Sequence, residues 1–436
     1  MKTISASSAI ILHKWYVWLV LMLLAMGLTA SAQTPSYTVI HGFNGSAASG
    51  SGPVGNLVED AAGSFYGVTS QSTDTEGYCY DTGCGAIFKL FKTASGGWAS
   101  ENLHTFTGDF DGDSPQGGLV FDAAGNLYGT TAYGGVDYLG NVFELTPASS
   151  GGWKYSVIYT FSYPETGGAV PSGPLVVDSR GNLYGTAGGG DGYGIIFELS
   201  PSSSGTWVET VLYSFQTETT GSRPQGPLVF DSAGNLYGTT YSGGEFGYGT
   251  VFEAFAPAGS GGWALTPLYS FSGRSDGKYP WYAGLIFDSA GNLYGTTSGG
   301  GHDSQCAGGC GVVYELSPNN ATGIWTQAVI HSFMGSGDGP GAGGAWPEYS
   351  LTADASGSLY GATYLGGKDG LGVVYKLTQS GGSWTESVVH YFSGGSAGAY
   401  PLQSGVVFGT DGDLYGLTFS GGIGPDCCGT LFRVAP

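Results

Sequence analysis

Charged side chains are scarce in this sequence, and basic ones are the scarcest. Of the 436 residues, 10% are Asp, Glu, Lys or Arg, with 12 basic against 33 acidic, whereas a soluble domain usually has about a quarter charged residues. The net charge of −21 excludes nucleic acid and anionic membranes as partners, because phosphate binding needs a basic face. With 14% aromatic residues, the chain is also neither an acidic disordered tail nor a coiled coil.

Long apolar runs are missing after the first thirty residues. Lys2 and Lys14 precede an apolar run at 15–28, and the small residues Ala-Ser-Ala follow at 30–32. This order predicts a secretory signal peptide at 1–32, cleaved after Ala32, and a secreted, periplasmic or cell-surface protein. An uncleaved anchor is the alternative, although a bilayer span needs about 20 residues. Cleavage removes two lysines and no acid, so the mature chain carries −23 and has no predicted transmembrane segment.

Glycine is abundant, with 83 residues, and much of it belongs to a repeated unit. A Tyr-Gly pair after Phe or Leu recurs at intervals of 53 to 66 residues. Its tyrosines are Tyr66, Tyr128, Tyr184, Tyr237, Tyr294, Tyr360 and Tyr415. Repeats of this length must be recognised before any local interpretation, and here seven units fill the chain from Tyr37 onward.

Each unit contains four short runs rich in Val, Ile, Tyr, Phe and Thr, separated by turn residues. In the second unit the runs are 119–122, 127–131, 141–145 and 155–161. Such runs predict strands, and four strands at a period near 50 residues are typical of propeller blades. We therefore predict an all-β fold, a seven-bladed β-propeller of four-stranded antiparallel blades, as a single domain at 33–436.

The two ends of the repeat array are complementary. The last unit stops after its third strand at Phe432, and the segment from Tyr37 to Phe43 precedes the first unit. We expect this N-terminal strand to join the last blade and close the ring, since an open array would leave unpaired strand edges. The fourth-strand phenylalanines that support this count are Phe43, Phe106, Phe161, Phe215, Phe271, Phe333 and Phe392.

The repeated segment resembles the Gloeo/Verruco tandem repeat. The likeness rests on Gly-Asn-Leu-Tyr-Gly-Thr-Thr with a preceding Asp, a following Gly-Gly, and then Gly-x-Val-Phe-Glu-Leu, and it covers 37–436. The resemblance implies an exported repeat protein and brings no established activity with it. Tailed members carry sorting or anchoring segments, whereas this chain ends at Arg433-Val434-Ala435-Pro436, without such an anchor.

Residues that recur at one place in most units are interpreted as structural. The histidines His41, His104, His331 and His390 stand two residues before the fourth-strand Phe, where other units have Tyr. The aspartates Asp60, Asp122, Asp178, Asp231, Asp288 and Asp354 precede a tight turn, and we expect each to accept backbone N–H bonds there. A catalytic triad or a multi-histidine metal site is therefore poorly supported.

A few aromatic residues depart from the repeat. Trp281, Tyr282, Trp346, Tyr349 and Tyr400 lie in loops between units, which in a propeller share one face with the loops between the second and third strands. Planar side chains there can stack on sugar rings, so these five are the predicted ligand-binding residues. A loop plug that packs over the central channel is the alternative.

Asp109, Asp111 and Asp113 form a D-x-D-G-D run in another loop of the same face. Alternating carboxylates suit Ca²⁺, which takes six to eight oxygen ligands, so calcium is the one candidate cofactor. The run lacks the glutamate of an EF-hand loop, and a solvated acidic loop is the alternative.

The six cysteines precede the third strands of three units, and their even number in an exported chain predicts disulfides. They are Cys79 and Cys84, Cys306 and Cys310, and Cys427 and Cys428. Neighbouring cysteines such as Cys427 and Cys428 are hard to pair with each other. Local pairs and a cross-link between the first and last units therefore both remain open.

Together these features predict a monomeric, non-catalytic extracellular binding module, with a polysaccharide or a surface protein as its partner. One alternative is a glycoside hydrolase or lyase, which would need paired carboxylates; Glu348 with Asp303 or Asp109 are the loop candidates. The other alternative is a surface scaffold for another protein.

Overall fold

The computed structural model describes most of the chain after the predicted signal peptide, which lies outside the described residues. Nearly all of the described residues belong to one compact unit, Tyr37–Pro436. The described ranges are 35–46, 49–72, 83–149, 151–162, 168–189, 192–216, 218–256, 262–302, 306–319, 321–335, 343–422 and 428–436. No helix in these ranges is long and apolar enough to cross a bilayer.

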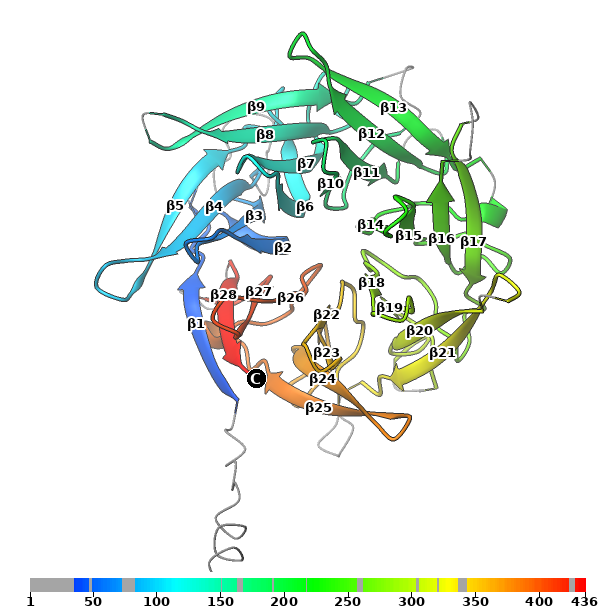
Figure 1. The fold of residues 1–436 in the computed structure, drawn as a ribbon. Coiled ribbons are helices and arrows are strands. Elements are labelled where there is room, and N and C mark those ends of the chain that lie inside the picture. Colours follow the sequence, from blue (N-terminus) through cyan, green and yellow to red (C-terminus); the bar gives the residue numbers. More distant parts are fainter. Residues whose placement is uncertain are drawn as a thin grey trace, which may run out of the picture. The chain divides into compact units, whose positions relative to one another are not determined.

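Within Tyr37–Pro436, small sheets follow one another around a ring, and the strands nearest its centre are β2, β6, β10, β14, β18, β22 and β26 (Figure 1). Four sheets consist of consecutive antiparallel strands. These are β10 (Val176–Val177), β11 (Leu183–Ala187), β12 (Ile195–Pro201) and β13 (Trp207–Ser214); β14 (Val229–Phe230), β15 (Leu236–Thr240), β16 (Thr250–Phe255) and β17 (Ala264–Ser270); β18 (Ile286–Phe287), β19 (Leu293–Thr297), β20 (Val312–Asn319) and β21 (Ile324–Ser332); and β22 (Thr352–Ala353), β23 (Leu359–Thr363), β24 (Val373–Ser380) and β25 (Ser383–Tyr391). Two short 3₁₀ turns, Glu218–Thr220 and Gly395–Ala397, lie between sheets.

The fifth four-stranded sheet joins the two ends of the chain and confirms the predicted closure. Its order is β1 (Ser36–Gly42), β28 (Thr430–Ala435), β27 (Leu414–Thr418) and β26 (Val406–Phe408). The N-terminal strand β1 therefore supplies the outer strand that the last repeat lacks. The fold is an all-β propeller with four-stranded blades.

The first two repeats differ from the prediction of separate sheets, because they share one eight-stranded sheet. Its strands, in sheet order, are β5 (Trp98–Thr105), β4 (Ala86–Lys92), β3 (Phe65–Gln71), β2 (Ser51–Glu59), β6 (Asp113–Phe121), β7 (Leu127–Tyr133), β8 (Asn141–Pro147) and β9 (Trp153–Thr160). Two antiparallel four-strand sets meet at one parallel pair, Asn56 with Gly118. Glycine permits this approach: a Cβ on Gly55 would lie 2.5 Å from the Gly118 nitrogen.

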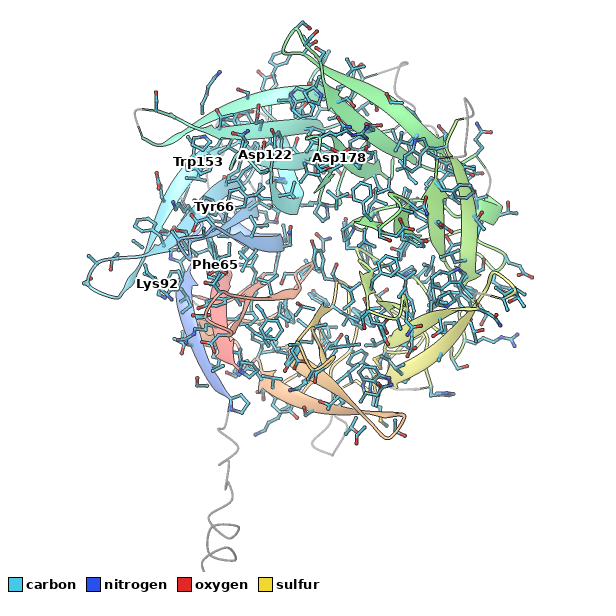
Figure 2. All side chains as sticks on the ribbon, viewed as in Figure 1. Phe65, Tyr66, Lys92, Asp122, Trp153 and Asp178 are labelled. Atoms are coloured by element: carbon cyan, nitrogen blue, oxygen red, sulfur yellow. A yellow bond between two sulfur atoms is a disulfide. The ribbon has the colours of Figure 1, made fainter. Side chains whose placement is uncertain are left out.

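The core consists of layers between neighbouring sheets, and the repeated aromatic residues build them. In five repeats the tyrosine of the Tyr-Gly pair, here called the marker tyrosine, contacts the tryptophan near the start of the outermost strand of an adjacent repeat. Tyr66 and Trp153, labelled in Figure 2, are in an edge-to-face contact at 5.7 Å, and Tyr128 and Trp207 repeat it at 5.8 Å. Edge-to-face pairs are a favourable aromatic geometry, so the marker tyrosine helps to fix how adjacent repeats pack.

The predicted role of the repeated aspartates is confirmed. Asp122, for example, accepts the N–H groups of Ala124 and Asn126 at 2.8 Å and the Tyr128 hydroxyl at 3.2 Å. The carboxylate thus completes the tight turn and orients the marker tyrosine of the next strand. The same turn recurs at Asp178 (Figure 2), which accepts N–H bonds from Arg180 and Asn182.

The repeated histidines pack between outer strands, as expected from their place in the repeat. His104 stacks on Tyr155 of the next outer strand at 3.7 Å, and His390 stacks on Tyr37 at 3.6 Å. Burial lowers the pKa of His390 to about 4, so this ring is neutral near pH 7.

Candidate binding face

A ring of seven residues, each directly before a proline, lies where the chain enters the innermost strand of each repeat. All seven have φ between 53° and 59°. We call this set the pre-proline ring, and its members are Gly52, Ser114, Val170, Arg223, Tyr279, Trp346 and Tyr400. Positive φ is uncommon for residues other than glycine and costs of order 1–3 kcal/mol, so six positions hold a strained backbone.

Hydrogen bonds to the preceding repeat hold this conformation. Every ring N–H donates to a carbonyl that lies shortly before a third strand, over 2.8 to 3.1 Å. Trp346 donates to Cys310, and its own carbonyl accepts the N–H of Tyr364 at 3.0 Å. Because the bonds involve only the backbone, the ring side chains are free to differ between repeats. Strained positions that the surroundings fix in this way are common at binding sites.

One group of aromatic residues surrounds Tyr279 and is called the Tyr279 cluster: Lys278, Tyr241, Tyr248, Tyr279 and Trp281. Tyr241 stacks on Tyr279 with ring centres 4.9 Å apart and contacts Trp281 at 5.7 Å. The Lys278 ammonium lies 5.5 Å from the centre of the Tyr279 ring and 6.0 Å from that of Tyr248. These rings are partly exposed and already have a cation of the protein beside them.

A second group, the Trp346 cluster, consists of Trp346, Glu348, Tyr364 and Tyr400. Trp346 and Tyr364 are nearly parallel, with ring centres 6.2 Å apart, and Tyr364 lies 5.4 Å from Tyr400. All three rings are partly exposed. Glu348 is only 5% exposed, and its Oε2 has no hydrogen-bond partner in the described part of the protein. Burial raises the pKa of Glu348 to about 7.

The charge of Glu348 acts on the tyrosines around it. Burial raises the pKa of Tyr364, and the nearby charge of Glu348 raises it further. The same two effects operate on Tyr282, although hydrogen bonds partly offset them. The unpartnered carboxylate therefore lies close to the aromatic rings of this face.

Tyr282 and Tyr349 are buried, with 6% of each side chain exposed. The Tyr282 hydroxyl donates to Gln116 Oε1 at 3.0 Å, joining inner segments that are three repeats apart. Tyr349 lines a cavity of about 250 Å³ with Asn56, Leu285 and other inner-strand residues. These two predicted residues thus pack toward the centre of the ring, as the plug alternative expects, while Trp281, Trp346 and Tyr400 present partly exposed rings.

The acidic run has protein partners. Asp111 accepts the Thr107 hydroxyl at 2.6 Å, the Thr107 N–H, and a bond from His104 at 3.1 Å. Burial opposes ionisation of Asp111, but these bonds hold its pKa below the usual value. Asp113 accepts the Ser114 hydroxyl, and burial raises its pKa. Across the described ranges, no group of three or more His, Cys, Asp or Glu side chains is arranged to hold a metal.

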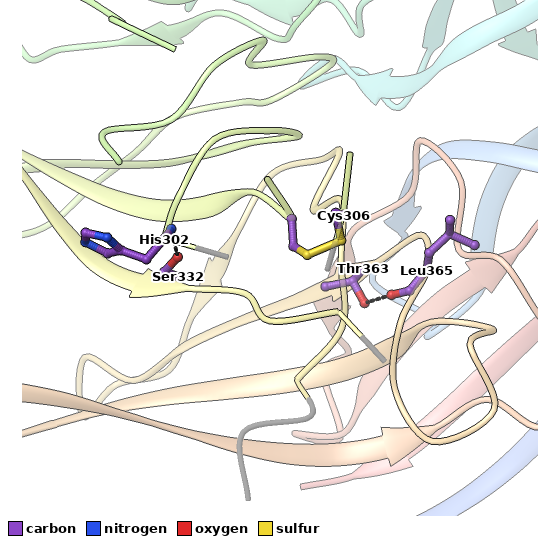
Figure 3. The surroundings of a disulfide bond; sticks show 6 residues. His302, Cys306, Ser332, Thr363 and Leu365 are labelled. Carbon is purple, nitrogen blue, oxygen red and sulfur yellow. Dashed lines mark hydrogen bonds between the residues drawn. A yellow bond between two sulfur atoms is a disulfide. The ribbon is translucent and has the colours of Figure 1, made fainter. Parts of the chain in front are cut away.

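The four cysteines that the structure describes lie beside the pre-proline ring. Cys306 and Cys310 form a disulfide next to His302, whose N–H donates to Ser332 Oγ at 3.0 Å (Figure 3). This is a local pair, one of the two arrangements left open by the sequence. Cys84 and Cys428 each take part in a disulfide as well. Cys79 and Cys427 lie outside the described residues, as does Asp303 of the hydrolase alternative. Carbonyls of Cys84, Cys310 and Cys428 accept the N–H groups of ring residues.

Sequence reasoning missed three aromatic residues of this face: Tyr241, Tyr279 and Tyr364. Each follows a structural rule that the sequence does contain. Tyr279 stands before the repeated proline, at the position of Trp346, and Tyr241 and Tyr364 directly follow the second strands β15 and β23. Aligning the seven prolines reveals Tyr279, and aligning the seven Tyr-Gly pairs reveals Tyr241 and Tyr364.

Comparison with known proteins agrees with the repeat and the fold. The model of the Gloeobacter/Verrucomicrobia repeat matches residues 27–219 and 155–343, which together exceed half of the chain. The chain belongs to the Gloeobacter/Verrucomicrobia repeat family. No curated protein matches it.

Solved structures with a similar fold are distant in sequence. A candidate 6-phosphogluconolactonase of Bacteroides uniformis has a TM-score of 0.50 and 15% identity, over 81% of this chain and 89% of that one. The periplasmic gluconolactonase of Pseudomonas aeruginosa has a TM-score of 0.48 and 16% identity, over 85% and 99%. At these identities the likeness concerns the propeller fold alone.

Proposed function

We propose that this member of the Gloeobacter/Verrucomicrobia repeat family is an exported, non-catalytic binding module for extracellular polysaccharide. Its fold would be a seven-bladed propeller, with the eight-stranded sheet counted as two blades, and its signal peptide would direct export. The single observation that carries the proposal is the group of three adjacent ring positions with aromatic side chains, Tyr279, Trp346 and Tyr400.

The geometry of these positions suits sugar binding. Each of these three side chains is planar and partly exposed, and its backbone is held by one hydrogen bond to the preceding repeat and one to its own repeat. Fixing the binding residues before the ligand arrives reduces the ordering cost of association. Aromatic faces stack on the apolar faces of sugars, and neighbouring positions on one ring can bind successive units of a polymer.

The likeness to lactonase propellers does not assign lactone hydrolysis, since it rests on 15% identity. Neither the hydrolase alternative nor the protein scaffold has an observation that favours it over binding. The experiment below distinguishes both alternatives from polysaccharide binding.

The test is isothermal titration of the mature protein with a panel of soluble polysaccharides, with the supernatants of insoluble ones assayed for released sugar. We expect the double variant Tyr279→Ala, Trp346→Ala to lose affinity by at least about tenfold, which is 1.4 kcal/mol. Tyr391→Ala is the control, because this exposed aromatic residue ends the outer strand β25. Unchanged affinity in the double variant would refute the site.

Two further results would replace the proposal. Sugar release that Glu348→Gln abolishes would make the protein an enzyme. A stoichiometric protein partner that co-purifies, together with no polysaccharide binding, would make it a scaffold.

A further inference from the structure

The two aromatic clusters occupy equivalent positions of the repeat but differ in charge. The segment Lys278-Tyr279-Pro280-Trp281 of one corresponds to Ala345-Trp346-Pro347-Glu348 of the other. In the Tyr279 cluster, the ammonium of Lys278 lies over two aromatic rings. In the Trp346 cluster, a buried alanine replaces this lysine, and none of the described lysine or arginine side chains lies over the three rings.

A buried carboxylate stands where the other cluster has a tryptophan. Glu348 is nine-tenths buried or more, and its Oε2 lacks a hydrogen-bond partner in the described ranges. An unpaired charge in such a place is unfavourable, so a carboxyl group here gains from a cation or a proton. Burial raises its pKa to about 7, which agrees with that need.

The surrounding rings are suited to a cation of a particular kind. Trp346, Tyr364 and Tyr400 present aromatic faces, which attract ammonium groups through the ring quadrupole. Metal ions would need several oxygen ligands, whereas this cluster offers one carboxyl group and carbon-rich surfaces. An organic ammonium group attached to an apolar body can pair with the carboxyl group and also pack against the aromatic faces.

The charge of the whole protein favours the same class of ligand. Starting from −21, removal of two lysines with the signal peptide leaves −23. A strongly acidic protein attracts cations over long range and repels polysaccharides rich in carboxylate or sulfate.

From these observations we propose that the Trp346 cluster binds the ammonium group of a de-N-acetylated amino sugar, with Glu348 as the ion-pair partner and the aromatic rings as its walls. This proposal rests on the proposed function and names the class of polysaccharide: a polymer that carries free amines.

The experiment compares two ligands that differ mainly in charge. The mature protein is titrated near neutral pH with a glucosamine tetramer and with the N-acetylated tetramer of the same length. We expect the amine form to bind about tenfold more tightly. Glu348→Gln should weaken binding of the amine form about tenfold, so that its preference over the acetylated form disappears, and Trp346→Ala should weaken both.

Glu245→Gln is the matched control, since it removes the same charge from an exposed position outside the cluster. Equal loss in both Gln variants would assign the preference to net charge and overturn the proposal. Thermal melts of each variant verify folding, and Glu348→Gln replaces a carboxyl group by an amide of nearly equal size.

The remaining outcomes separate the two proposals. If neutral and amine tetramers bind equally through Trp346, the ammonium site is refuted and the polysaccharide module stands. If choline binds in a Glu348-dependent manner but no polysaccharide does, the ammonium site stands without its sugar and the proposed function fails. If neither choline nor the amine tetramer binds, the ammonium site is refuted.

Discussion

The buried carboxyl of Glu348 makes a sharp prediction about stability and pH. In the folded protein its pKa is about 7, against an ordinary value of 4.5. Between these values the folded protein keeps a proton that the unfolded chain has lost, so stability falls as pH rises through this window. Above about pH 7 the loss is complete, and 2.5 pKa units correspond to about 3 kcal/mol.

Glu348→Gln should therefore stabilise the protein, and only at high pH. Near pH 4 the variant and the wild type should unfold at the same temperature, because the carboxyl is neutral in both states. At about pH 8 the variant should melt about 4 °C higher, given an unfolding entropy of about 2 cal/mol/K per residue over some 400 residues. Thermal unfolding followed by circular dichroism across this range measures the difference.

The control for this measurement is Glu245→Gln, which should show no such gap at any pH because Glu245 is exposed. The Glu348→Gln variant could instead be no more stable than wild type at about pH 8, or more stable by the same amount at every pH. Either result would show that the carboxyl group is not both buried and unpaired in the folded protein. Loss of stability at every pH would point instead to an essential hydrogen bond.

Three other perturbations test the framework. Gly125→Ala should lower the free energy of unfolding by about 1 kcal/mol through its positive φ alone. Gly55→Ala should lower it clearly more, because its Cβ would also lie 2.5 Å from a backbone nitrogen. Equal losses of the two variants in urea unfolding would contradict the tight contact between the first two repeats. Replacing Cys306 and Cys310 with serine should cost about 2 kcal/mol, and no loss of melting temperature would show that the disulfide does not constrain the chain. A chelator should leave the melting temperature unchanged, because Asp111 has protein partners; a fall would instead support a calcium site.

Periodic features explain how much of the fold could be predicted. The spacing of Tyr66 and its equivalents gave the repeats, and the surplus strand before the first repeat gave the closure by β1. Both follow from the chain order alone. The merger of the first two repeats into one sheet could not be predicted, since it depends on one backbone pair, Asn56 with Gly118. Local packing decides such a contact.

The candidate site was predicted only in part, for a related reason. Trp281 and Trp346 were found because tryptophan is rare and these two depart from its pattern. Tyr241, Tyr279 and Tyr364 were missed, because tyrosine is frequent throughout the repeats and three more do not stand out. The burial of Tyr282 and Tyr349 depends on contacts with residues of distant repeats, such as Gln116 and Asn56, which the sequence does not specify.

The pre-proline ring explains how one repeated backbone can acquire a specific site. Its members share the same φ and the same backbone interactions, yet their side chains range from glycine to tryptophan. A side chain at such a position takes no part in holding its own conformation, so it can change without disturbing the blade behind it. Selection for binding can therefore act on Tyr279, Trp346 and Tyr400, while the repeated Asp, Tyr and Trp residues maintain the sheets. Glu348 directly follows one of the ring prolines, so the variation between repeats also includes a buried position of this face.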